Sequence, residues 1–237
     1  MLPVGGFLVL HLWTNTAALG GASSYTAAVE DIQRLPGLAA LEIFGIYLPL
    51  AFHALYGVRL IFASRSNLDH YPYNRNYLYI LQRVSGLVAF VFIAYHLWEF
   101  RIQKYLGHMQ PGAFFDTLVA HLSRVQNASI GVFVPSVPWL AIFYAVGILA
   151  CVFHFSNGIV TFVISWGVVG TRRALRWVNW VAALGGTALF AMGYATLLYL
   201  ATGAHLPLDV RANSAQPCPA PSAQPTVNSA TSPTKSE

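Results

Sequence analysis

Five apolar stretches dominate the 237-residue chain, and each approaches the roughly 20 residues that a helix needs to cross a bilayer. They cover residues 2–19, 39–62, 77–100, 137–169 and 178–201. Apolar residues make up 56% of the chain and charged residues only 9%, a balance that no water-soluble domain of this size needs. The sequence therefore predicts an all-α membrane protein with five transmembrane helices in a single domain over residues 1–205.

The first stretch is the shortest, and its position could suggest a signal peptide. It lacks a basic segment before the apolar run, however, and it carries His11, Trp13 and Asn15. We therefore interpret residues 2–19 as a span. Because the apolar run begins at the initiating methionine, we expect the start of the chain to be truncated.

Basic residues indicate how the spans are oriented, because short loops rich in arginine and lysine stay in the cytoplasm. The cytoplasmic set lies in or beside the loops after the second and fourth spans: Arg59, Arg65, Arg75, Arg83, Arg172, Arg173 and Arg176. The opposite loops carry fewer basic residues, namely Arg34, Arg101, Lys104 and Arg124. We expect a multi-pass protein of the cell inner membrane with a cytoplasmic N-terminus and an extracytoplasmic C-terminus. This topology accounts for the net charge of +5, so nucleic acid is not an expected partner.

Two segments outside the spans have distinct characters. Residues 206–237 are rich in Pro, Ser and Ala, and we expect a disordered tail there. Residues 111–125 have apolar side chains at helical spacing and predict a short interfacial helix. The histidines outside the spans are interpreted as interfacial or solvated: His70, His108, His121 and His205.

Four histidines fall one in each of the first four spans: His11, His53, His96 and His154. An ionisable side chain in hydrocarbon is costly, so each is a functional candidate, although four separate structural histidines remain the alternative. Neutral imidazole ligates haem iron, and a pair of imidazoles suits electron transfer. Cys151 and Cys218 form no CxxC or CxxCH motif, which argues against iron–sulfur ligation and c-type haem. We interpret the histidines as axial ligands of two b-type haems, held in a four-helix bundle with a fifth helix beside it.

Position along the spans indicates which histidines pair. His96 lies close to the outer end of its span, and His11 precedes the first outer loop by about two turns, so both are expected to be outer. His53 lies six residues before Arg59 at the inner end. Depth alone does not place His154, which is assigned to His53 by elimination.

Further polar residues in the spans are candidates for the site. Glu42 lies eleven residues before His53, which returns a helix to within about 20° of the same face, so we expect it to point into the bundle near the outer haem. It is either a proton-handling or quinone-site residue or a helix-start carboxylate favoured by the dipole. Arg83 is either a partner of a haem propionate or a snorkelling anchor. Ser85 and Gly86 would let a cofactor approach.

Three runs of sequence carry a family resemblance. They are LEIFGIYLPLAFHALYGV around His53, YNRNYLYILQRVSGLVAFVFIAYHLWE up to His96 and FHFSNGIVTFVISWG around His154. These runs cover most of residues 40–170 and resemble the dihaem cytochrome b membrane anchors of succinate:quinone oxidoreductases, in the class where one five-span polypeptide holds both haems. The resemblance implies that His11 and His96 ligate the distal haem and that His53 and His154 ligate the proximal haem.

The resemblance also implies partners and a direction of electron flow. A flavoprotein subunit with covalent FAD would oxidise succinate, and an iron–sulfur subunit would pass the electrons to the proximal haem. The distal haem would then reduce a quinone, often menaquinone in this class, with Glu42 as a candidate residue of the quinone site. The partner subunits would dock on the cytoplasmic loops, at Arg65, Arg75, Arg172, Arg173 and Arg176.

Two alternatives to this function remain. The first is the anchor of a fumarate reductase, running from quinol to fumarate. Fumarate-reducing relatives have a glutamate two residues before the fourth ligand, where this chain has Val152, so the sequence favours succinate oxidation. The second is a haem-free polytopic transporter, which predicts inverted repeats that the sequence does not show.

Overall fold

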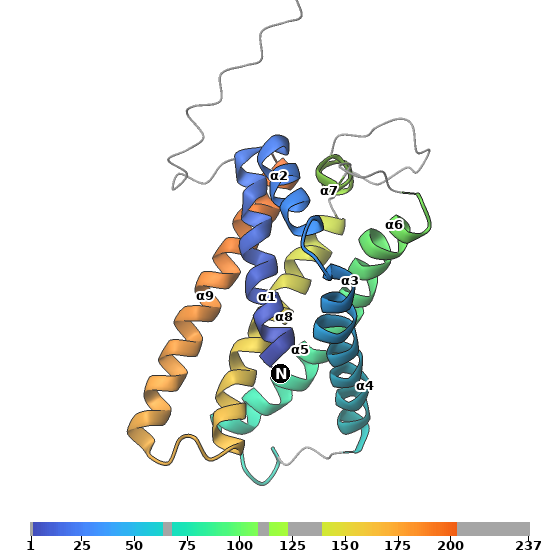
Figure 1. Cartoon of the computed structure of the whole chain (residues 1–237). Helices are drawn as coiled ribbons and strands as arrows, with labels where there is room; N and C mark the ends of the chain where they lie inside the picture. Colours follow the sequence, from blue (N-terminus) through green and yellow to red (C-terminus); the bar gives the residue numbers. More distant parts are fainter. Residues whose placement is uncertain (1, 64–67, 109–113, 123–138, 203–237) are drawn as a thin grey trace, which may run out of the picture.

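The computed structural model describes residues 2–63, 68–108, 114–122 and 139–202, and every regular element in these ranges is helical (Figure 1). Within this part of the chain, four helices are long and apolar enough to cross a membrane: Leu38–Ala63, Asn74–Tyr105, Trp139–Ser165 and Arg172–Thr202. The shortest has 26 residues, or about 39 Å at 1.5 Å per residue, against a hydrocarbon core of about 30 Å. The predicted class of helical membrane protein is confirmed, and the fifth span stays a prediction.

The first predicted span covers residues 2–19, but the α-helix in this part of the structure is shorter. Helix α1 covers Leu2–Asn15, and it is followed by a 3-10 turn, Thr16–Gly20, and by α2, Ala22–Gln33. At 14 residues, α1 is about 21 Å long, which is less than the thickness of the hydrocarbon core. It nevertheless lies inside the bundle beside α9 (Figure 1). Its position therefore brings His11 among the longer helices.

The second and third spans each contain a π-helical segment. The helix Leu38–Ala63 consists of α3, Leu38–Ala40, the π-helical η2, Leu41–Tyr47, and α4, Leu48–Ala63. The helix Asn74–Tyr105 consists of α5, Asn74–His96, the π-helical η3, Leu97–Ile102, and α6, Gln103–Tyr105. Because this helix runs past the predicted end at residue 100, Arg101 and Lys104 lie on it and not in the outer loop where we expected them. Such segments are rare and are frequently found at functional sites.

The last two spans form a helical hairpin. Helix α8 covers Trp139–Ser165 and α9 covers Arg172–Thr202. At the end of α8, Gly167 has a φ of +67°, and the amides of Gly167 and Val168 bond back to the carbonyls of Ile164 and Val163. This Schellman arrangement ends α8, and glycine adopts its left-handed conformation without strain. Helix α9 begins before the predicted start at residue 178, so the arginines expected in the loop lie on its first turns: Arg172, Arg173 and Arg176.

The two ends of the bundle differ. Helices α2 and α7, the latter spanning Phe114–Leu122, lie at one end, called here the α7 end, and the turn through Gly167 lies at the other, called the Gly167 end (Figure 1). Helix α7 confirms the short helix predicted over 111–125 where the chain is described. It buries Leu118 and Leu122 in an apolar cluster with residues of α8 and α9. The predicted tail, residues 206–237, lies outside the described residues.

Candidate functional site

His11 of α1 and His96 of α5 meet towards the α7 end. The centroids of the two imidazole rings are 5.7 Å apart and the ring planes cross at 75°. Aromatic rings flank both histidines, because Phe7 stacks on His11 at 5.2 Å and Phe92 stacks on His96 at 5.8 Å. The structure therefore brings together the two histidines that were expected to form the outer pair.

His53 of α4 and His154 of α8 form the second pair. Their ring centroids are 5.9 Å apart and the planes cross at 73°. Tyr144, whose hydroxyl contacts His96, precedes His154 by ten residues on α8, so the two pairs are about 15 Å apart along the helix. The four rings thus meet in the expected pairs at two depths of the bundle, while ligation itself stays a prediction.

The spacing within each pair fits an iron ion between the rings. An imidazole nitrogen bonds a metal ion at about 2.0–2.1 Å, so two imidazoles on opposite sides of one ion have ring centroids about 6.3 Å apart. The observed separations of 5.7 Å and 5.9 Å are within about 0.6 Å of this value. Both pairs are therefore suited to the two axial positions of a haem.

In two of the histidines, hydrogen bonds determine which ring nitrogen carries the proton and which keeps its lone pair. Nδ1 of His154 lies 3.0 Å from the backbone carbonyl of Gln82, which can only accept, so Nδ1 carries the proton. Nδ1 of His96 lies 3.2 Å from the hydroxyl of Tyr144, whose single proton is donated to the carboxylate of Glu99. The Tyr144 oxygen must therefore accept from Nδ1 of His96. In both rings Nε2 keeps its lone pair for a metal ion, as in metal-binding histidines whose other nitrogen donates to the protein.

His11 is held differently from His96 and His154. The amide nitrogen of Asn15 donates to the carbonyl of His11 at 2.7 Å and lies 3.4 Å from Nε2 of its ring. Tyr25 donates to the amide oxygen of Asn15 at 3.4 Å. Ligation of iron through Nε2 of His11 would replace the long contact with Asn15.

Small residues of α5 pack against His154. A Cβ atom at Gly86 would come within 2.8 Å of Cε1 of the imidazole, so only glycine fits at this position of α5. Ser85 is buried, donates to the carbonyl of Gln82 at 3.1 Å and lies 3.5 Å from Nδ1 of His154. The side chain of Gln82 in turn donates to the carbonyl of His154 at 3.0 Å. Ser85 and Gly86 thus lie against the histidine, their expected role in admitting a cofactor stays a prediction, and Gln82 is a contact that sequence reasoning missed.

Arg83 lies half-buried on α5 and contacts Tyr79. Its guanidinium carbon lies 4.1 Å from the centre of the Tyr79 ring, and it donates to the Tyr79 hydroxyl. A propionate contact stays a prediction for Arg83.

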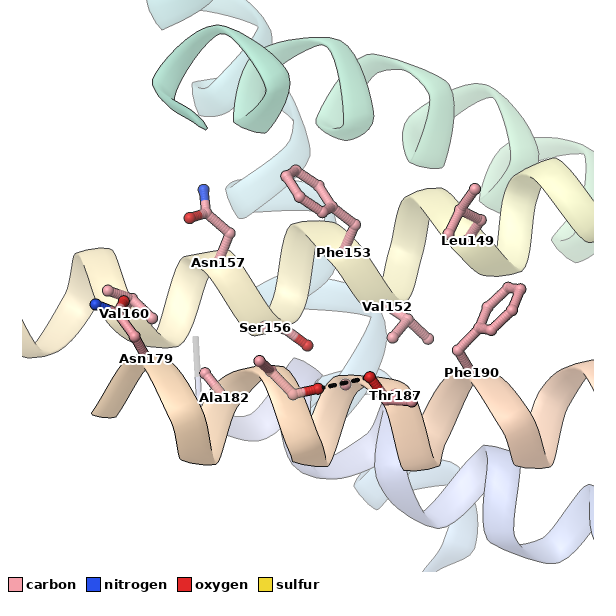
Figure 2. Close-up of a pocket in the computed structure, with 12 residues that line it drawn as sticks. Leu149, Val152, Phe153, Ser156, Asn157, Val160, Asn179, Ala182, Thr187 and Phe190 are labelled. Atoms are coloured by element: carbon pink, nitrogen blue, oxygen red, sulfur yellow. Dashed lines mark hydrogen bonds between the residues drawn. The ribbon is translucent and has the colours of Figure 1, made fainter. Parts of the chain in front are cut away.

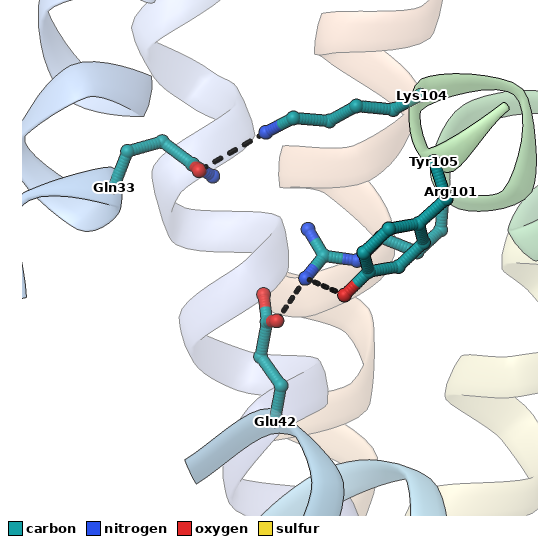
Figure 3. A network of polar contacts seen from close by, with 5 residues as sticks. All are labelled: Gln33, Glu42, Arg101, Lys104 and Tyr105. Carbon is teal, nitrogen blue, oxygen red and sulfur yellow. Dashed lines mark hydrogen bonds and ion pairs between the residues drawn. The ribbon is translucent and has the colours of Figure 1, made fainter. Parts of the chain in front are cut away.

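Glu42 of η2 forms an ion pair with Arg101 of η3 (Figure 3). The side chains of Glu42 and Arg101 are 14% and 21% exposed, so the pair is largely shielded from solvent. Arg101 also donates to the Tyr105 hydroxyl at 3.0 Å, and Lys104 donates to Gln33 of α2 at 3.0 Å. This network joins the second and third spans and α2 near the α7 end, and sequence reasoning did not predict it.

Glu99 is the buried carboxylate nearest to the outer histidine pair. It lies in η3, only 6% exposed, and accepts hydrogen bonds from Tyr144 of α8 and from Nδ1 of His121 on α7, the latter at 2.5 Å. His121 was expected to be solvated or interfacial, and its side chain is exposed in the structure, where it is bonded to Glu99. The one sequence signal for this cluster is that Glu99 follows His96 by three residues, which places both on one helix face.

A pocket of about 390 Å³ opens between α8 and α9 (Figure 2). Its polar lining comes from Ser156, Asn157, Asn179 and Thr187, and a Cβ at Gly186 would meet Oγ of Ser156 at 2.4 Å. Thr187 donates to the carbonyl of Ala183 within α9. Neither histidine pair lines this pocket, so it is separate from the candidate site.

Comparison with known proteins identifies a relative of the chain. No protein-family model matches the chain, and no solved structure matches it. The succinate dehydrogenase cytochrome b558 subunit of Bacillus subtilis (strain 168) is 38% identical over 193 residues, which cover 81% of this chain and 88% of the relative. With histidines paired between its helices and an alignment of this extent, the chain belongs to the family of succinate dehydrogenase cytochrome b558 subunits.

Proposed function

We propose that this chain carries electrons from an iron–sulfur subunit to a quinone through two b-type haems, one at each histidine pair. The observation that carries the proposal is the approach of histidines from four different helices in two pairs, at 5.7 Å and 5.9 Å. The name of the Bacillus subtilis relative, a cytochrome b558 subunit, supports haem b as the cofactor. Haem iron with two histidine ligands supplies one-electron transfer.

The residues around each pair would hold and enclose the haems. His53 and His154 would ligate the haem nearer the Gly167 end, where Gly86 admits the imidazole of His154, Ser85 lies beside that ring and Arg83 would meet a propionate. His11 and His96 would ligate the haem nearer the α7 end. Bonds from Nδ1 to Gln82 and Tyr144 orient the rings of His154 and His96, which a ligand set needs in order to keep its geometry.

The proposed topology places the Gly167 end in the cytoplasm. The first turns of α9 carry three arginines there, in line with the positive-inside rule. Partner subunits, a flavoprotein with FAD and an iron–sulfur protein, would dock on this side and deliver electrons to the nearer haem. Helix α1 would complete five spans, with the N-terminus cytoplasmic, the C-terminus outside and α9 beside the four helices that carry histidines.

The quinone, menaquinone in our proposal, would react near the α7 end. Glu42 is a candidate for proton handling there because it is a shielded carboxylate in that part of the bundle. Its ion pair with Arg101 supports a structural role equally well. The two roles differ in their effect on activity, since a proton-handling carboxylate affects quinone reduction without affecting haem content.

Haem stoichiometry in the purified complex tests the proposal. We expect two b-type haems per chain, both low-spin and both reduced by succinate. The variant His154→Ala should remove one haem, and the exposed His108→Ala should keep both. A complex without haem, or one in which His154→Ala retains two bis-histidine haems, would refute the assignment.

The direction of electron flow is tested separately. Val152, two residues before His154, supports succinate oxidation over the fumarate-reductase alternative. A coupled assay should show succinate-driven quinone reduction faster than fumarate reduction by a low-potential quinol. The opposite ratio would favour a fumarate reductase anchor.

A further inference from the structure

The two histidine pairs differ in the charge of the groups to which their Nδ1 atoms are connected by hydrogen bonds. Nδ1 of His154 donates to the neutral backbone carbonyl of Gln82 at 3.0 Å. Nδ1 of His96 donates to Tyr144 at 3.2 Å, and Tyr144 donates to the carboxylate of Glu99. A hydrogen-bonded path therefore connects a buried carboxylate to one pair, whereas a neutral carbonyl supports the other.

We propose that Glu99, acting through Tyr144, sets the redox potential of the haem held by His11 and His96. This inference rests on the proposed haem ligation by those histidines. A ligand becomes more basic when its other nitrogen donates to a group that is itself hydrogen-bonded to an anion, and a more basic ligand favours ferric over ferrous iron. Glu99 is 6% exposed, so water screens its charge little, and its effect on the nearby iron is larger than that of a surface carboxylate. Glu99 and Tyr144 are positioning residues in this proposal, because they act on the iron through His96.

His121 holds the Glu99 carboxylate from the side opposite Tyr144. Its ring donates to the second carboxylate oxygen of Glu99 from α7, and its side chain is 38% exposed. Glu99 is therefore held from two helices, by Tyr144 on the haem side and by His121 on the solvent side. The two contacts fix the orientation of the carboxylate towards Tyr144.

The test is a redox titration of the intact complex with its partner subunits, following each haem by its optical and electron paramagnetic resonance spectra. Glu99→Gln keeps an acceptor for the Tyr144 hydroxyl and removes the charge. We expect the midpoint potential of one haem to rise, by about tenfold in its reduction equilibrium, or about 59 mV for one electron. The other haem should keep its potential. Tyr144→Phe should raise the same potential, because it disconnects His96 from the carboxylate.

Matched controls separate this effect from general changes in charge or packing. Glu30→Gln makes the same substitution at the same end of the bundle, at an exposed carboxylate paired with Arg34. Tyr194→Phe removes a hydroxyl from α9, where the ring stacks on Phe190. Neither control should change the midpoint potential of either haem. The double variant of Glu99 and Tyr144 should shift the potential by less than the sum of the single shifts, because both residues act along one path.

The outcomes distinguish failure of this inference from failure of the proposed function. If the unmodified complex lacks two haems, the haem assignment fails and this inference fails with it. The inference alone is wrong if two haems are present and Glu99→Gln changes neither midpoint potential or changes both equally. It is also wrong if the change caused by Glu99→Gln is no larger than the change caused by Glu30→Gln. Should Glu99→Gln not assemble, Tyr144→Phe decides by the same criteria, with Tyr194→Phe as its control.

Discussion

Gly86 of α5 faces His154 of α8 so closely that a Cβ atom would come within 2.8 Å of the imidazole. The imidazole cannot move away freely, because its Nδ1 is bonded to Gln82 of the same helix α5. We therefore expect Gly86→Ala to displace the ring of His154 from His53. The measurement is the haem content of the purified complex, which should fall by one haem per chain or show an altered low-spin signal.

The control for this variant is Gly57→Ala. Gly57 lies on α4, four residues after His53, and a Cβ there would meet nothing within 4 Å. Haem content should be unchanged in this variant. Equal losses in the two variants would mean that glycine is needed for a reason other than its contact with His154.

Gly147 provides a separate test of helix packing. A Cβ at this position of α8 would lie 2.2 Å from the ring of Phe92 on α5, whereas a Cβ at Gly185 of α9 would meet nothing within 4 Å. Gly147→Ala should therefore destabilise the α5–α8 contact by about 1–3 kcal/mol, the usual result of overpacking. Gly185→Ala should be neutral or stabilising by up to about 1 kcal/mol, because alanine favours a helix. Thermal unfolding in detergent measures both, and a lower stability for Gly185→Ala than for Gly147→Ala would contradict this packing.

The positions of the spans and the depths of three of the histidines could be predicted from the sequence, because they depend on strong and local constraints. Bilayer thickness requires long apolar helices, and these are visible in the sequence at about the right residues. The depth of His11, His53 and His96 follows from counting along each span. The start of α9 was placed too late, because arginines on its first turns resemble a loop by composition alone.

The supporting contacts could not be predicted, because they depend on how helices rotate against one another. Gln82 and His154 are 72 residues apart in the chain, and His96 and Tyr144 are 48 apart. The position of Glu42 was argued from a regular helical period, but Leu41–Tyr47 is π-helical, so the angle per residue changes. Its partner, Arg101, was assigned to a loop because the sequence does not show where the third helix ends.

The Glu42–Arg101 ion pair should be costly to break from one side. Removing one partner leaves the other charge shielded and unpaired, so Glu42→Gln should destabilise the protein by up to about 3–5 kcal/mol. The double variant Glu42→Gln, Arg101→Gln should recover much of this loss, since no charge remains uncompensated. Unfolding measurements on the two single variants and the double variant give the coupling free energy. Additive effects would mean that the two side chains do not depend on each other.

His121 should make the docking of α7 depend on pH. The hydrogen bond to Glu99 raises the pKa of His121 above the usual histidine value of about 6.5, with burial acting in the opposite direction. A raised pKa in the folded state means that protonation stabilises the contact fully below pH 6.5 and that this stabilisation is lost as the pH rises through the folded-state value. Amide hydrogen exchange in Phe114–Leu122, corrected for the intrinsic effect of pH, should therefore become faster with rising pH. His121→Gln should abolish this dependence, and His108→Gln, at an exposed histidine bonded to Gln103, should preserve it. If α7 in the unmodified protein exchanges equally at all pH values, the ion pair with Glu99 does not hold the helix in place.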